Sequence, residues 1–388
     1  MFTLFQPKKM AVLVSAVLGS ASLVSTVQAQ EVVVKIGHVA PMTGNIAHLG
    51  KDNENGAKLA IEHLNAKNWK IDGKAVKFEL VAEDDAADPK QGTAAAQKLV
   101  DAKVNGVVGH LNSGTTIPAS KIYNEAGIPQ ISPSATNPKY TLQGFKTAFR
   151  VVANDGQLGG TLGKYAVNTL KAQSIAVIDD RTAYGQGVAD EFTKAAKKAG
   201  GKIVATQFTN NQATDFNAIL TAIKAKNPDV VFYGGMDAQA GPLLRQMKQL
   251  GINAKVMGGD GMCTEELGKL AGDGLGDGQV ICAEAGGVDD NSKYKVSYDK
   301  FRDLYKKKFN EEVKLYAPYV YDATMVLAEA MKKANSVEPT KYLPFVAKIK
   351  HEGVTGLIEF DANGDIKNGS LTLYTYKGGK RDRLAVVK

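Results

Sequence analysis

The chain has 388 residues, of which 44% are hydrophobic and 23% are charged, and its formal net charge at pH 7 is +8. This is the composition of a globular protein, and the length predicts two domains of roughly 150–200 residues each rather than one core. The lysines are scattered and mixed with acids, without a basic stripe interleaved with aromatic residues, so the charge argues against a nucleic-acid partner.

The first residues are typical of a secretory leader. Lys8 and Lys9 precede an uncharged apolar stretch over residues 10–24, and Val27 and Ala29 form a small-x-small cleavage pattern. We expect residues 1–29 to be a signal peptide cleaved after Ala29. No cysteine stands at the cleavage point for a lipid anchor, so we expect a free secreted protein.

Two α/β units follow in tandem, each with short apolar strands alternating with amphipathic helices. This rhythm predicts doubly wound parallel sheets. In the first unit, strands are expected over residues 32–39, 78–83, 104–108 and 129–132, with a helix over 113–125. In the second unit, strands are expected over residues 174–179, 203–208, 230–233, 255–257 and 280–283, with helices over 188–199 and 240–250.

The C-terminal segment mixes helices and strands, which predicts that the chain crosses between the lobes. Helices are expected over residues 293–309, 319–334 and 341–350. Strands over 353–361 and 371–376 are expected to form a hairpin around the turn residues Asn363 and Gly364. Several crossings would form a hinge about which rigid lobes close.

Polar residues follow two neighbouring strands of the first unit. Ser113 opens a helix directly after one strand, and Ser134 and Thr136 follow the next strand. A helix N-terminus at the carboxyl edge of a parallel sheet suits a carboxylate. Simple helix capping by Ser113 and an ordinary Ser/Pro turn at Ser134 are the alternative interpretations.

In the second unit, glycine-rich loops follow three strands. They contain Tyr184, Met236 and Asp260, and Asp260 lies among glycines in the segment 258–261. Its carboxylate could bind an ammonium group, or it could simply form a turn.

Signatures of an enzyme are missing from the sequence. There is no G-x-S-x-G, H-E-x-x-H or P-loop motif, and the five histidines are scattered. We therefore expect no catalysis, no metal site and no cofactor. The two cysteines, Cys263 and Cys282, most simply form a disulfide in an oxidising compartment.

Seven segments in order resemble the periplasmic leucine/isoleucine/valine-binding protein family: VVVKIGHVAPMTG, DDAADPKQG, GHLNSGTTIPAS, ISPSATNP, DDRTAYGQG, FYGGMDAQAG and MGGDG. The resemblance implies a periplasmic-binding-protein type I α/β fold with two doubly wound parallel-sheet lobes and a three-strand hinge. Lobe 1 would comprise residues 30–153 plus 287–358, and lobe 2 residues 154–286 plus 359–388.

The resemblance also implies the ligand-binding residues of an amino-acid receptor. Ser113, Ser134 and Thr136 would bind the α-carboxylate and part of the ammonium group, next to the backbone of Ala135. Asp260 would bind the ammonium group beside Gly261. Three further residues would surround the rest of the ligand: Tyr184, Met236 and Leu49.

The chain also departs from the enteric members of that family. Those proteins have Glu in place of Asp260 and aromatic residues in place of Met236 and Leu49. Their first-lobe cysteine pair is replaced by Ala86 and Asn112, and Tyr316 and Tyr319 could supply aromatic cover instead. The implied function is that of a monomeric receptor that binds an aliphatic, branched-chain amino acid and delivers it to the permease and ATPase of an ABC importer. Receptors for an amide, an aromatic acid or another amino acid, and a ligand sensor for a chemoreceptor, are the alternatives.

Overall fold

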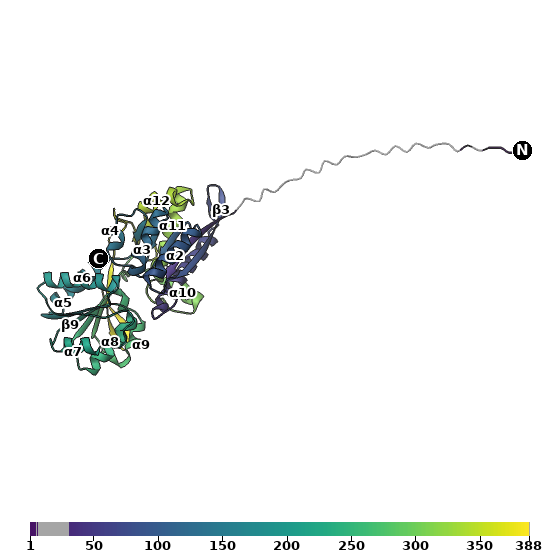
Figure 1. The fold of residues 1–388 in the computed structure, drawn as a ribbon. Helices are drawn as coiled ribbons and strands as arrows, with labels where there is room; N and C mark the ends of the chain where they lie inside the picture. Colours follow the sequence, from purple (N-terminus) through teal and green to yellow (C-terminus); the bar gives the residue numbers. More distant parts are fainter. Residues whose placement is uncertain (5, 7–30, 388) are drawn as a thin grey trace.

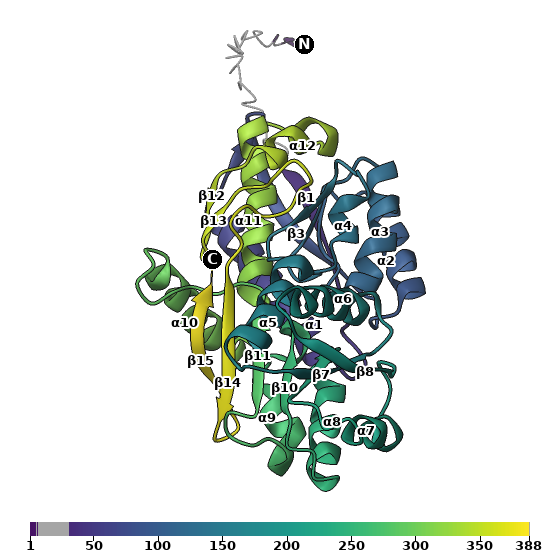
Figure 2. The same ribbon diagram turned by 90° about the vertical axis from the view of Figure 1, so that its left-hand side faces the viewer.

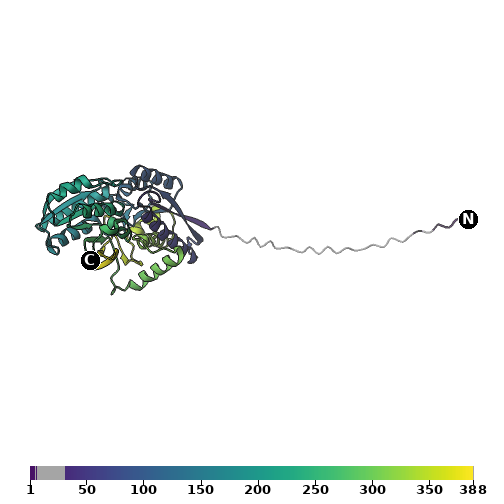
Figure 3. The same cartoon turned by 90° about the horizontal axis from the view of Figure 1, so that it is seen from below.

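The computed structural model describes residues 1–4, 6 and 31–387. Apart from residues 1–4 and 6, the predicted signal peptide over residues 1–29 lies outside the described part of the chain. The described residues form two lobes, each built on one sheet (Figure 1). Seen from below, the purple and blue segments of the first lobe lie beside the teal and green segments of the second (Figure 3).

The first lobe is built on a six-stranded sheet with the order β2-β3-β1-β4-β5-β6, in which only β2 is antiparallel to its neighbour. Its strands are β1 (Val32–Ala40), β2 (Lys70–Ile71), β3 (Lys74–Asp84), β4 (Gly106–Gly109), β5 (Gln130–Ser132) and β6 (Ala148–Arg150). Its helices are α1 (Ala47–Ala66), α2 (Pro89–Asp101), α3 (Ser113–Glu125), α4 (Lys139–Leu142), α10 (Lys295–Phe309), α11 (Ala317–Ala334) and α12 (Pro339–Ala347).

Both faces of this sheet are covered, as its apolar strands require. On one face, α1 and α11 pack on Ile36 and Val108. On the other face, α2 and α3 pack on Val39 and Val107. Neighbouring residues of β4 therefore point to opposite cores. Because both faces of the strand are buried, every position is apolar or small and the sequence shows no alternation.

The second lobe is built on a seven-stranded sheet with the order β15-β14-β11-β10-β9-β7-β8. Its strands are β7 (Ser174–Asp179), β8 (Lys202–Phe208), β9 (Val230–Gly234), β10 (Lys255–Gly258), β11 (Val280–Glu284), β14 (Leu371–Lys377) and β15 (Lys380–Val387). Its helices are α5 (Asp155–Asn168), α6 (Ala183–Lys198), α7 (Asn217–Lys224), α8 (Asp237–Gln249) and α9 (Glu266–Ala271), with short 3₁₀ turns η1 (Asp260–Met262) and η2 (Gly272–Gly274).

The predicted C-terminal hairpin was wrong. β14 pairs with β15 instead, across Gly378 and Gly379, whose φ angles of 55° and 73° suit a tight two-residue hairpin turn. The segment expected to pair with β14 forms β13 (Leu357–Ile358), which pairs with β12 (His351–Glu352). Figure 2 shows β14 and β15 in yellow at one edge of the second lobe.

The chain passes between the two sheets three times: after β6, after β11 and after β13. The first and third passages are tied together, because Arg150 forms an isolated parallel bridge with Asp365. This is the predicted three-strand hinge.

Candidate ligand-binding site between the lobes

A small cavity lies where strand ends of the two lobes face each other. The free space between its lining residues, including the part that opens to solvent, is about 210 Å³. The lining residues come from the loops after β4, β5, β7, β9 and β10 and from the segment before α11: Leu111, Asn112, Ser113, Ser134, Tyr184, Met236, Asp260, Gly261 and Tyr316.

Six of the nine predicted site residues line this cavity: Ser113, Ser134, Tyr184, Met236, Asp260 and Gly261. The other three do not. Ala135 and Thr136 are buried directly after Ser134, and Leu49 is buried on α1 within the main hydrophobic core. Leu111 and Asn112 are lining residues that the sequence did not place in the site, and Tyr316, which the sequence offered as possible aromatic cover, also lines the cavity.

The lobe 1 side of the cavity is the N-terminus of α3. The helix begins at Ser113 right after β4, and the preceding residue, Asn112, makes no side-chain capping bond. The Ser113 hydroxyl accepts a hydrogen bond from Asn137 N (3.2 Å), and the Ser134 hydroxyl donates one to Leu111 O (3.1 Å). A helix N-terminus that lacks a side-chain cap carries partial positive charge and suits an anionic group.

The lobe 2 side of the cavity carries one carboxylate, that of Asp260. Its side chain is buried, Oδ2 accepts a hydrogen bond from the Tyr316 hydroxyl (2.8 Å), and Oδ1 has no hydrogen-bond partner among the described residues. Burial raises the pKa of Asp260 to about 6, although the Tyr316 hydroxyl acts in the opposite direction. A buried carboxylate with a free oxygen is costly unless a donor or a cation meets it.

Tyr184 holds the loop that carries Asp260. Its hydroxyl accepts a hydrogen bond from Gly261 N (2.9 Å). A Cβ atom at Gly261 would lie 2.7 Å from Met236 Sδ, 2.7 Å from Tyr184 Cε1 and 2.9 Å from Gly235 O. Only glycine therefore fits between these side chains, which makes Gly261 a residue of close approach.

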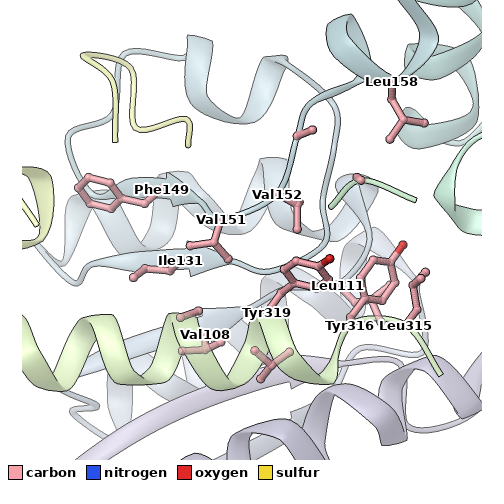
Figure 4. Close-up of a cluster of buried hydrophobic side chains, with 14 of the residues drawn as sticks. Val108, Leu111, Ile131, Phe149, Val151, Val152, Leu158, Leu315, Tyr316 and Tyr319 are labelled. Atoms are coloured by element: carbon pink, nitrogen blue, oxygen red, sulfur yellow. The ribbon is translucent and has the colours of Figure 1, made fainter. Parts of the chain in front are cut away.

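Tyr316 reaches the cavity because a buried carboxylate fixes the segment before α11. Asp52 on α1 accepts hydrogen bonds from the backbone N–H groups of four consecutive residues, at 2.7–3.1 Å. These residues are Lys314, Leu315, Tyr316 and Ala317. Figure 4 shows Tyr316 and Leu315 at the end of the hydrophobic core near Leu111.

A second buried acid lies close to the site without lining the cavity. Asp155 is the first residue of α5, its backbone N–H donates to Thr136 O (2.8 Å), and neither carboxylate oxygen has a hydrogen-bond partner in the part of the chain that the structure describes. Burial raises the pKa of Asp155 to about 8, and the charge of Asp260 adds to this. No pattern in the sequence singled out Asp155.

The lobes are in contact in this structure. Besides Tyr316 and Asp260, Asn137 of the first lobe donates a side-chain hydrogen bond to Ala183 O of the second (2.6 Å). The site is thus closed on both sides by groups from opposite lobes.

The predicted disulfide is present. Cys263 and Cys282 are bonded, with Cα atoms 5.4 Å apart, and both residues are fully buried. The bond connects the segment after η1, which carries Asp260 and Gly261, to the neighbouring strand β11.

Within the described residues, no cluster of three or more His, Cys, Asp or Glu side chains could hold a metal ion. No helix of that part of the chain is both long and apolar enough to cross a bilayer.

Two α/β lobes joined by three passages, with a polar cavity between them, define the class of two-lobed solute-binding proteins. The chain belongs to the periplasmic binding protein family, whose profile it matches over residues 33–380. This confirms both the resemblance and the type I fold.

Three relatives within this family carry the names of amino-acid-binding proteins. The chain is 38% identical over 377 residues to an amino acid binding protein of Pseudomonas aeruginosa, covering 96% of both chains. It is 35% identical to the leucine-, isoleucine-, valine-, threonine-, and alanine-binding protein of the same organism, covering 88% of this chain and 90% of the relative. It is 38% identical to the Leu/Ile/Val-binding protein homolog 1 of Brucella abortus, covering 89% of this chain and 91% of the relative.

Two solved structures of leucine and branched-chain amino acid binding proteins have the same fold as this chain. The leucine binding protein LivK of Thermotoga maritima matches with a TM-score of 0.82 and 28% identity, covering 92% of this chain and 99% of that protein. The branched-chain amino acid transporter substrate binding protein LivJ of Streptococcus pneumoniae, solved in complex with isoleucine, matches with a TM-score of 0.81 and 29% identity over the same shares of the two chains.

Proposed function

We propose that this protein is the periplasmic receptor of an ABC importer and binds an aliphatic, branched-chain L-amino acid between its two lobes. The observation that carries the proposal is the pairing, across one cavity, of the buried Asp260 carboxylate with the α3 N-terminus at Ser113. A zwitterion has the two charges that such a site complements.

The two polar ends of the ligand have different partners. The α-carboxylate binds the α3 N-terminus, where the Ser113 hydroxyl accepts from Asn137 N and keeps its own proton to donate. Ser134 lines the same side of the cavity, and Ala135 supports it from behind, with its N–H bonded to Ser132 and its carbonyl bonded to Arg150. The ammonium group binds the free oxygen of Asp260, whose raised pKa falls again when a cation meets the carboxylate. Thr136 lies next to Ser134 behind the cavity surface, and its buried hydroxyl has no hydrogen-bond partner among the described residues.

The rest of the cavity suits an uncharged side chain. Leu111, Met236 and the rings of Tyr184 and Tyr316 supply its apolar surface, and the lining residues of the described chain include no basic side chain. The amino-acid names carried by the relatives support the same ligand class. Leu49 contributes through the core behind α1 rather than at the cavity surface.

Ligand binding would stabilise the closed arrangement of two rigid lobes, residues 30–153 plus 287–358 and residues 154–286 plus 359–388. The receptor would be a monomer without catalytic activity or cofactor, exported by cleavage after Ala29, and it would hand its ligand to the permease and ATPase of the importer.

Calorimetric titration of the protein from residue 30 onward, unfolded and refolded to remove bound ligand, tests the proposal. The titrants are the twenty amino acids, a set of short amides and a set of aromatic acids. We expect saturable binding of leucine, isoleucine or valine, weakened at least tenfold in Ser113→Ala and at least a hundredfold in Asp260→Asn. Asp303→Asn, on the exposed face of α10, is the matched control. Binding of amides or aromatic acids alone would overturn the amino-acid assignment.

A further inference from the structure

A group of four charged or ionisable side chains joins the lobes outside the ligand cavity. His48 on α1 and Lys314 before α11 belong to the first lobe, whereas Asp237 on α8 and Glu266 on α9 belong to the second. His48 Nε2 lies 2.8 Å from Asp237 Oδ2, and Lys314 Nζ lies 2.9 Å from Glu266 Oε1. None of the four lines the cavity between Ser113 and Asp260.

The His48–Asp237 pair is unlike an exposed surface ion pair, which contributes little because solvent screens it. The Asp237 side chain is fully buried and the His48 side chain is 23% exposed. Asp237 is also held in place, because Oδ2 accepts a hydrogen bond from the Thr264 hydroxyl (2.6 Å) and because it is the first residue of α8. Thr264 directly follows the disulfide-bonded Cys263.

The two partners of this pair sit on elements that move relative to each other when the lobes open. His48 belongs to a helix that packs on the first sheet, and Asp237 follows β9 of the second sheet. Opening would separate them and expose the Asp237 carboxylate to water. The pair would therefore form only in the closed arrangement.

We propose that His48 and Asp237 form a latch between the lobes, which adds to ligand affinity without touching the ligand and makes that affinity depend on pH. The inference rests on the proposed function, because it requires a ligand that stabilises lobe closure. A latch of this kind acts through the open–closed equilibrium, since ligand affinity scales with the population of the closed state.

The charges around His48 determine whether ligand affinity rises or falls with pH. Asp237 from α8, Glu266 from α9 and Lys314 from the segment before α11 face the ring. Burial and the charge of Lys314 lower the pKa of His48. The hydrogen bond to Asp237 and the charges of Asp237 and Glu266 raise it by more, so the pKa of His48 is raised above 6.5. In an open form, His48 loses Asp237 and its pKa returns toward the ordinary value of a histidine.

The closed form therefore binds a proton more tightly than the open form. The contribution of the latch to affinity is fully present below the ordinary histidine pKa and is lost as pH rises through the raised pKa of the closed form. Ligand binding near neutral pH should be accompanied by proton uptake at His48.

The test compares the pH dependence of ligand binding in the full mature protein and two variants. His48→Gln removes the titrating ring from a partly exposed position. His63→Gln, on the same helix, is the matched control, because His63 contacts Tyr321 of its own lobe. The dissociation constant for leucine is measured between pH 5.5 and 8.5 by calorimetry, in buffers of different ionisation enthalpy that report protons taken up.

We expect the unsubstituted protein and His63→Gln to bind leucine about three- to tenfold more tightly at pH 5.5 than His48→Gln does, with the difference vanishing toward pH 8.5. Titration of Asp260, Asp155 and the other acids contributes equally to the pH profiles of all three proteins, so it does not affect the difference between them. Asp237→Asn should reproduce the His48→Gln profile.

Equal pH profiles and equal proton uptake in the unsubstituted protein and His48→Gln would overturn the latch. If the unsubstituted protein binds no amino acid at any pH, the proposed function fails, and the latch fails with it. If leucine binds but another amino acid binds more tightly, the same comparison is made with that amino acid.

Discussion

The hydroxyl of Tyr316 donates a hydrogen bond to Asp260 Oδ2 over 2.8 Å and thereby joins the two lobes at the ligand cavity. The same contact leaves Oδ1 of Asp260 as the oxygen available to a ligand. Tyr316 thus both fixes one oxygen of the carboxylate and bridges the two lobes.

Tyr316→Phe should weaken amino-acid binding about fivefold to twentyfold, because the ring remains but a hydrogen bond to a buried charged group is lost. The dissociation constant is measured by calorimetry. Tyr342→Phe is the matched control, because the hydroxyl of Tyr342 bonds Asn105 O within the first lobe. Equal losses in the two variants would show that the Tyr316 hydroxyl has no particular part in binding.

Asp155 should make the stability of the ligand-saturated protein fall with rising pH. Burial raises its folded-state pKa to about 8, well above the value of 3.8 for an unperturbed Asp. Its contribution to stability is therefore fully present below about pH 4 and is lost as pH rises to about 8. Asp155→Asn removes this titration without changing the shape of the side chain.

The melting temperature of Asp155→Asn minus that of the unsubstituted protein should increase between pH 5 and 8 and then level off, measured by calorimetry with saturating ligand. The underlying free-energy change is at most about 1.4 kcal/mol per pH unit. Asp303→Asn serves as the exposed control. A temperature difference that stays constant over this range would contradict the burial of a titrating carboxyl at Asp155.

The disulfide should stabilise the second lobe. Cys263 and Cys282 are separated by 19 positions in the sequence, and replacing both by Ala should lower the free energy of unfolding by roughly 3 kcal/mol. Adding a thiol reductant should lower the melting temperature of the unsubstituted protein toward that of the variant. The variant itself should not respond to the reductant. A response of equal size in both proteins would show that the reductant acts elsewhere.

Six residues that line the cavity could be predicted from the sequence, partly because parallel sheets place ligands at the carboxyl ends of strands and partly through the resemblance to the family. Ser113, Ser134 and Asp260 each follow a strand whose apolar run is easily recognised. Leu111 and Asn112 lie in the same loop as Ser113 and were missed only because their side chains carry no distinctive chemistry.

Tyr316 could not be placed from the sequence for a different reason. Its position depends on Asp52, 264 residues away, whose carboxylate holds the backbone before α11. The hairpin was misplaced because the turn at Asn363–Gly364 closes only an isolated bridge between Phe360 and Ile366. β14 instead pairs with β11 and β15 in the second sheet.

Arg150 should couple the ligand loop to the hinge. Its side chain is fully buried, and its guanidinium donates to Ala135 O (3.1 Å), Asn137 O (2.9 Å) and the carboxylate of Asp365. Ala135 and Asn137 follow Ser134, which lines the cavity, whereas Asp365 lies in the third passage between the lobes. One cation thus connects a segment at the cavity with two of the three hinge segments.

Arg150→Lys keeps the charge but loses the planar fork that serves several acceptors at once. The free energy of unfolding should fall by roughly 2–4 kcal/mol, and amino-acid affinity should fall with it because the loop after β5 loosens. A double-mutant cycle with Asp365→Asn measures how strongly Arg150 and Asp365 are coupled in stability. Because both residues belong to one buried network, the two substitutions should be non-additive in stability by at least about 1 kcal/mol. Additive effects, measured by denaturant unfolding, would show that the bond between Arg150 and Asp365 does not connect the loop to the hinge.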